Sequence, residues 1–272
     1  MVVQHNLTAM NSNRMLGLTT ATQAKSTEKL SSGYKVNRAA DDAAGLAISE
    51  KMRRQVRGLT QASANAQDGI SCVQTAEGAL NEVHDMLQRM NELAVKAANG
   101  TNQSEDRAYI QSEVDALVSE INRVAETTTF NEKMLLDGTF KDVELQVGAE
   151  EAAGNQIVLT IAAMDANGLN VESVSVEEAA DAKSAITTIK DAIKTLNGQR
   201  SDLGAVQNRL EHTINNLDNV VENTTAAESQ IRDTDMATEM VKYSNNNILT
   251  QAGQAMLAQA NQANQGVLSL LQ

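Results

Sequence analysis

Apolar side chains recur every three or four residues between positions 48 and 97, and this is the strongest pattern in the chain. The series runs through Ile48, Met52, Val56, Leu59, Ala62, Ala66, Ile70, Val73, Ala76, Leu80, Val83, Leu87, Met90, Ala94 and Ala97. Its mean step of about 3.5 residues is the period of a coiled coil rather than of a straight surface helix. One helix of this length extends about 75 Å, whereas a compact globule of this size measures about 50 Å. The pattern therefore predicts an elongated, rod-like molecule.

A break in this pattern separates the first long helix from a second, shorter one. The Asn-Gly-Thr-Asn sequence at 99–102 tolerates the left-handed conformation of a helix end, and Ser104, Glu105 and Asp106 suit a helix start. The apolar series then resumes at Ile110, Val114, Leu117, Ile121 and Val124. Because the turn is short, the two helices are expected to form an antiparallel hairpin.

Residues 137–172 change to a strict alternation of apolar and polar side chains. Val143, Leu145 and Val147 alternate with polar residues, and Ile157, Leu159 and Ile161 do so again after a glycine-containing loop. This pattern predicts one small β-hairpin at about 140–165.

Helical periodicity returns near Glu177 and continues to about Asp233. Its apolar seam is Ile186, Ile189, Ile193, Leu196, Leu203, Val206, Leu210, Ile214, Leu217 and Val221, with Arg200 filling one step. Two long seams need partners, and the simplest partner for each is the other. We therefore expect a mainly α fold, an elongated antiparallel helical bundle or coiled coil with paired N- and C-terminal helices. The predicted domains are a terminal one, 1–40 with 234–272, and a rod-like core, 41–233, that includes the hairpin.

The two ends of the chain predict further helices that carry almost no charge. After Lys242 there is no Asp, Glu, Lys or Arg. Apolar residues at steps of three or four mark one stripe at each end: Val3, Leu7 and Met10, and Leu249, Gly253, Met256, Ala260, Ala263, Val267 and Leu270. These faces are too poor in bulky groups to hold isolated helices in water. We expect the terminal helices to order when many copies pack together, so these stripes are the predicted self-assembly surface.

Composition and charge argue against several other classes of protein. Aromatic residues make up 2% of the chain and there is no Pro, which favours long helices over a deep ligand pocket. The net charge of −13 opposes nucleic-acid binding. Cys72 is the one cysteine, and its apolar neighbours predict a buried thiol. No apolar run is long enough to span a membrane, and no cleavable secretory leader is recognised.

Sequence signatures of catalysis or of metal binding are not found. His5, His84 and His212 lie far apart without a second His nearby, and no glycine-rich phosphate loop or nucleophile motif occurs. Asp41 and Asp42 precede a helix start, where they are expected to complement the helix dipole. The sequence thus predicts neither an enzyme nor a cofactor.

Several segments resemble bacterial flagellin, the subunit of the flagellar filament. They are LSSGYKVNRAADDAAGLAISEKMRRQVRGLTQASANAQDGIS at 30–71 and the stretches 74–102, 127–138, 199–240 and 251–272. The resemblance covers nearly the whole chain and implies a short flagellin without an outer variable domain. It also implies export through the flagellar type III apparatus with an export chaperone, an extracellular location, and hook-associated and cap proteins as partners. Terminal segments of such monomers are expected to be disordered before assembly.

The resemblance further implies a surface that a host Toll-like receptor senses. The matching residues are Gln88, Arg89, Leu93 and Glu113, which we expect to serve first as contacts between subunits. Leu117 stands where many receptor-active flagellins carry a basic residue. Two alternatives remain open at this point: the junction protein between hook and filament, and a cytosolic coiled-coil binding module.

Overall fold

The computed structural model describes residues 6–269, and their side chains as far as residue 262. Its helices are α1 (Leu7–Ser32), α2 (Ala43–Ala97), α3 (Ser104–Thr127), α4 (Ala179–Arg232) and α5 (Met236–Ser269), and a short 3-10 helix spans Ala153–Asn155. The strands are β1 (Thr129–Phe130), β2 (Lys133–Met134), β3 (Val143–Gln146) and β4 (Gln156–Leu159). The chain divides into two compact units, unit 1 (Met1–Arg54 with Asn223–Gln272) and unit 2 (Gln55–Glu222). The mainly α prediction is confirmed.

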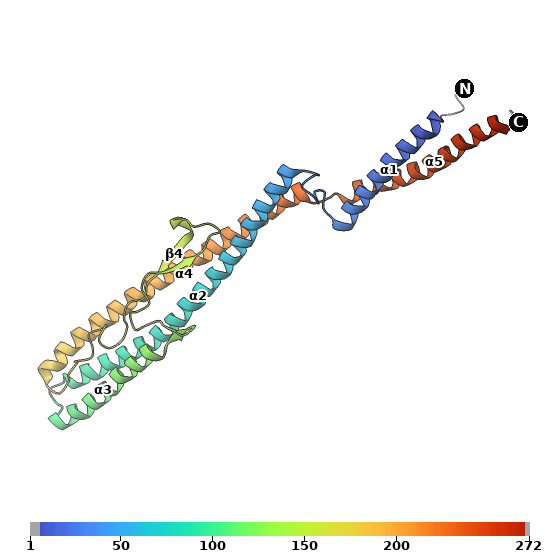
Figure 1. Ribbon diagram of the computed structural model, residues 1–272. Coiled ribbons are helices and arrows are strands. Elements are labelled where there is room, and N and C mark those ends of the chain that lie inside the picture. The colour runs from blue at the N-terminus through green and yellow to red at the C-terminus, as the bar shows by residue number, and fades with distance from the viewer. Residues whose placement is uncertain (1–5, 270–272) are drawn as a thin grey trace. The chain divides into compact units, whose positions relative to one another are not determined.

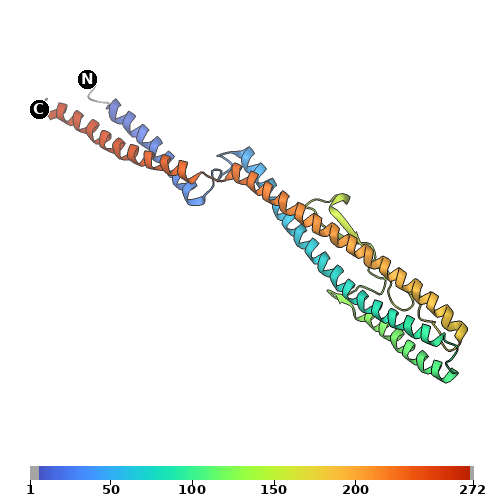
Figure 2. The same ribbon diagram turned by 180° about the vertical axis from the view of Figure 1, so that it is seen from behind.

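In unit 2, helices α2, α3 and α4 lie side by side around one apolar core (Figures 1 and 2). The predicted α2 seam is almost completely buried beyond Leu59, as shown by Ala66, Val73, Leu80 and Leu87. The α4 seam fills the same core through its own buried residues, Ala182, Ala185, Ile189, Ala192, Leu196 and Leu203.

The start of the α2 seam differs from the prediction. Ile48 lies in the part of α2 that belongs to unit 1, and 47% of its surface is exposed. The prediction that Ile48 belongs to a buried seam is therefore wrong within a single chain. Asp42 accepts a hydrogen bond from the Gly45 N–H at 2.9 Å and so caps the start of α2.

Polar contacts fix the antiparallel course of the three helices. Between α2 and α3, the Arg107 Nε donates to the Ala97 carbonyl at 3.0 Å, directly across the predicted turn. The Asp106 carboxylate accepts the Gln103 N–H at 3.0 Å and so stabilises the start of α3. Between α2 and α4, Arg200 lies 3.7 Å from Glu77, which explains how an arginine can occupy a step of the seam.

The predicted β-hairpin is present, and a second one was not predicted. Strands β3 and β4 pair antiparallel, with Val143 opposite Leu159 and Gln146 opposite Gln156. Strands β1 and β2 form a two-residue hairpin whose turn places Asn131 and Glu132 at positive φ. Residues at positive φ in such turns are usually Gly or Asn. Because Glu132 occupies one of the two positions, the sequence did not predict this turn.

In unit 1, helices α1 and α5 lie side by side and run antiparallel (Figures 1 and 2). The connections at their inner ends are tied together: the Lys35 N–H donates to the Arg232 carbonyl at 2.6 Å, and the Thr234 N–H to the Gly33 carbonyl at 2.9 Å. The Arg232 guanidinium also lies 4.6 Å from the ring centre of Tyr34. The start of α1 and the end of α5 are thereby brought to the same end of the pair, as the sequence predicted.

Candidate functional site

The inner face of the terminal helix pair, α1 and α5, consists mainly of small and polar side chains. Asn6 donates to the Ala260 carbonyl at 3.0 Å, and the Thr250 hydroxyl donates to Gln23 at 3.2 Å. A Cβ atom added at Gly253 would lie 3.3 Å from Leu16, so the helices approach closely at this point. Amides, hydroxyls and a glycine hold this contact together, with little of the apolar burial that stabilises unit 2.

One carboxylate is buried within this inner face. The Ser26 hydroxyl donates to Glu239 Oε1 at 2.6 Å, and both residues are buried in the pair. This hydrogen bond lowers the pKa of Glu239, and the positive charges of Lys242, at 3.5 Å, and Lys29 lower it further. The carboxylate is thus held in its charged form between the two helices.

The outer apolar face of the pair, by contrast, carries most of its exposed large hydrophobic side chains. It comprises Leu7, Met10, Met15 and Leu18 on α1 and Val241, Ile248, Leu249 and Met256 on α5. Each of these side chains is 52% to 69% exposed. At 100° per residue, Leu7, Met10 and Leu18 point away from Leu16, and Val241 and Ile248 point away from Gly253. Met15, Leu249 and Met256 lie at the edge of this face, beside the contact between the helices. An exposed apolar face of this kind marks an interaction surface.

The members of the stripe that the sequence predicted on α5 differ in exposure. Leu249 and Met256 belong to the outer apolar face, whereas Ala260 is half-buried against α1. At 100° per residue Leu249, Met256 and Ala260 all lie within about 60° of Gly253, so they form one side of α5. Leu7 and Met10, from the stripe predicted at the N-terminal end, are exposed. Val3 and Leu270 lie outside the described residues, and Ala263 and Val267 lie in α5 beyond the described side chains.

Some members of the outer apolar face were not predicted. Met15 and Leu18 lie beyond Met10, the last residue of the stripe predicted at the N-terminal end. Val241 and Ile248 are seven residues apart, and this spacing is a signal that could have identified them.

The second predicted surface lies on α2 and α3 of unit 2. The Arg89 guanidinium donates to Glu113 through Nε at 3.0 Å and through a terminal nitrogen at 2.8 Å, and to Glu92 at 3.1 Å. These bonds raise the pKa of Arg89, with Glu113 contributing most. Gln88 lies on the same exposed face. Leu93 was expected on this surface, but it is 2% exposed because it packs into the core, so that placement is wrong.

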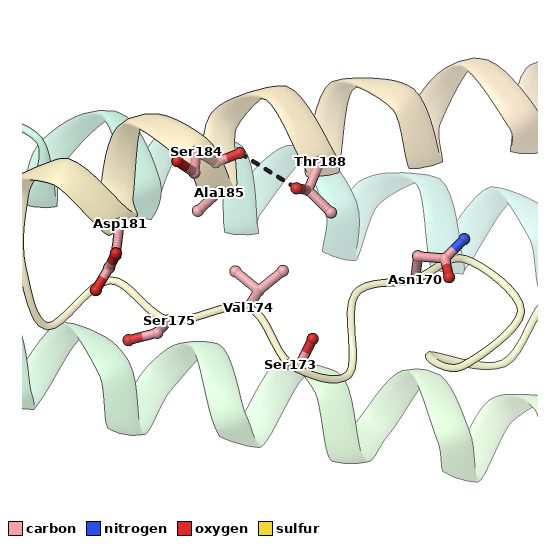
Figure 3. Close-up of a pocket in the computed structure, with 8 residues that line it drawn as sticks. All are labelled: Asn170, Ser173, Val174, Ser175, Asp181, Ser184, Ala185 and Thr188. Carbon is pink, nitrogen blue, oxygen red and sulfur yellow. Dashed lines mark hydrogen bonds between the residues drawn. The ribbon is translucent and has the colours of Figure 1, made fainter.

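Figure 3 shows a pocket of unit 2 and the side chains that line it. It has a volume of about 180 Å³ and lies between residues 170–175 and the start of α4. Thr188 uses its hydroxyl to donate to the Ser184 carbonyl at 3.2 Å, and the Ser184 hydroxyl donates to the Ala180 carbonyl at 3.4 Å. These hydroxyl groups therefore bond to the helix backbone instead of to a general base.

Metal binding, membrane insertion and thiol chemistry can also be addressed for the described part of the chain. Within it, no group of three or more His, Cys, Asp and Glu side chains could hold a metal ion. Over residues 6–269 no helix is long and apolar enough to cross a membrane. Cys72 is buried as predicted, and burial raises the pKa of its thiol.

Comparison with known proteins places these features in a family. The bacterial flagellin N-terminal helical region matches residues 3–141, and the bacterial flagellin C-terminal helical region matches residues 186–271. A flagellin of Halalkalibacterium halodurans is 55% identical over 274 residues, and a flagellar filament 31.3 kDa core protein of Treponema maltophilum is 50% identical over 286 residues. Both alignments cover 100% of this chain and 100% of the relative.

A solved structure is also similar. The crystal structure of Bacillus cereus flagellin is 34% identical and covers 57% of this chain and 88% of its own, with a TM-score of 0.50. With two family regions and full-length relatives matched, the chain belongs to the bacterial flagellin family, the structural subunits of the flagellar filament, and is not an enzyme.

Proposed function

We propose that the chain assembles into the flagellar filament by packing the outer apolar face of its terminal helix pair against the same face of neighbouring copies. The observation that carries this proposal is the distribution of side chains in the pair, where small polar groups join α1 to α5 and large apolar groups are left outside. Burying a Leu, Ile or Met side chain contributes about 1.5–3 kcal/mol. Neighbouring copies supply the burial that a single chain does not provide.

The lack of charge at the C-terminal end supports this mechanism. In a polymer each helix meets copies of itself, so any charge on the contact face would face a like charge. From residue 243 onward the chain has no Asp, Glu, Lys or Arg. Neutral apolar and amide side chains can pack against their own copies without that repulsion.

Seeded polymerisation tests the proposal directly. A chain that lacks residues 243–272 should fail to add to filament seeds, and so should the Met256→Asp variant, because an unpaired charge in a packed interface costs several kcal/mol. Ala263→Asp is expected to act in the same way. Met134→Asp is the matched control, since Met134 is 44% exposed in unit 2. Normal growth of the Met256→Asp variant would refute assembly through this face.

The domain division follows from the same proposal. Residues 1–40 and 234–272 would line the inner tube of the filament, and residues 41–233 would surround it. We expect the terminal helices to order on assembly. Limited proteolysis of monomer and filament should then cleave the terminal residues of the monomer first and spare them in the filament. Equal protection in both states would contradict this coupling.

The finer statements on partners and location rest on the flagellin resemblance. We propose export of the unprocessed chain through the flagellar type III apparatus with its chaperone, and contacts with hook-associated and cap proteins. Gln88, Arg89 and Glu113 are proposed as contacts between subunits and, secondarily, as a surface for the host Toll-like receptor. Arg89→Ala should weaken receptor activation by soluble monomer, with an unchanged response to the variant as the opposing result.

A further inference from the structure

The charge of the chain is distributed very unevenly between its two units. Unit 1 holds ten of the 22 Lys and Arg residues and eight of the 35 Asp and Glu residues, so its formal charge is +2. Unit 2 holds the other twelve basic and 27 acidic residues, so its formal charge is −15. The excess of negative charge thus belongs entirely to unit 2.

Three of the ten basic residues of unit 1 line one pocket between α1 and α5. A pocket of about 420 Å³ is lined by Thr22, Lys25, Ser26, Lys29, Glu239, Lys242, Asn245 and Asn246. It combines three ammonium groups with one carboxylate. That carboxylate, Glu239, is buried and already accepts hydrogen bonds from Ser26 and Lys242.

The ammonium groups keep most of their binding capacity. The Lys25 side chain is 73% exposed and its ammonium lies 4.0 Å from Asp41, at the limit of an ion pair. The Lys242 side chain is 61% exposed and has Glu239 at 3.5 Å. Each ammonium has three N–H donors, so one partner leaves others available. The amides of Asn245 and Asn246 add further donors beside them.

We propose that this basic pocket binds carboxylates of a second copy of the chain, supplied chiefly by its unit 2. The inference rests on the proposed function, in which copies pack together. Each copy carries a net charge of −13, so copies repel one another through their acidic units. A local positive site that meets a neighbour's carboxylates offsets this repulsion and selects the orientation in which the two copies approach.

Removal of the three positive charges tests the proposal. The test variant combines Lys25→Gln, Lys29→Gln and Lys242→Gln. The control combines Lys183→Gln, Lys190→Gln and Lys194→Gln, three exposed positions on α4, and therefore has the same net charge. The critical concentration for growth on seeds is measured for both, at low ionic strength and in 1 M NaCl.

An exposed ion pair changes an equilibrium constant by about twofold, so the test variant should raise the critical concentration about tenfold above the control at low ionic strength. In 1 M NaCl the difference should disappear, because the Debye length falls to about 3 Å. Replacing the same three lysines by arginine should restore normal growth. Equal critical concentrations of test and control variants at low salt would overturn the proposal, and so would a loss that persists in 1 M NaCl.

The wild-type chain separates this proposal from the one on which it rests. If wild-type monomers do not add to seeds at all, the assembly function itself is wrong. If they do, and the test variant behaves like the control, the pocket has no role as a carboxylate site and assembly through the outer apolar face still stands.

Discussion

Replacing Ser26 by alanine should weaken the terminal helix pair at a single identified bond. The Ser26 hydroxyl donates to the buried Glu239 carboxylate at 2.6 Å. A hydrogen bond to a charged group contributes about 2 kcal/mol. Lys242 remains 3.5 Å from the carboxylate in the variant and keeps it from being left without a partner. If pairing of α1 with α5 accompanies assembly, the critical concentration should rise about 30-fold.

The pH dependence of the same pair gives a second measurement. Because the folded pKa of Glu239 lies below its ordinary value of 4.5, its contribution is fully present above about pH 4.5. The contribution is lost as the pH falls through the lowered pKa. Acid should therefore dissociate filaments of Ser26→Ala at a higher pH than wild-type filaments. Glu239→Gln, which has no charge to lose, should remove this contribution to the acid transition.

The assay is seeded growth combined with amide hydrogen exchange of α1 and α5. Ser31→Ala is the matched control, because it makes the same substitution at an exposed position of the same helix. If the pair is already formed in the monomer, the Ser26→Ala defect appears there as faster exchange. The reasoning is refuted if Ser26→Ala and Ser31→Ala agree in critical concentration, acid transition and exchange.

Three further predictions concern other contacts. Leu93→Ala should lower the free energy of unfolding by about 2–5 kcal/mol in urea, because Leu93 is 2% exposed, whereas Val95→Ala, at 54% exposed, should have little effect. Asp235→Ala removes the acceptor of two N–H bonds at the start of α5, and exchange in that first turn should become about fivefold faster. Arg89→Ala removes an exposed ion pair, so its urea midpoint should match that of wild type, and a clear shift would contradict this.

The parts of the fold that could be predicted are those in which the spacing of apolar residues has a single cause, burial in a core. The apolar seam of α2 was visible because a buried coiled-coil face needs bulky residues at a fixed spacing. In the terminal helices the apolar spacing does not identify the buried face, because mainly small and polar residues join the two helices and many large apolar residues are exposed. Ser26 and Glu239 could not be identified as partners, because they are 213 residues apart and each is typical of an exposed helix position.

The β3–β4 hairpin has a consequence for protein engineering. Gln146 and Gln156 are paired across the two strands, so the segment between them leaves and returns at the same place. A foreign peptide inserted near Ala152 would have both of its ends held together by that pairing. Each doubling of such a loop costs only about 0.6 kcal/mol of closure entropy. The hairpin thus offers a position for multivalent display of peptides along a filament, far in sequence from both helices of the terminal pair.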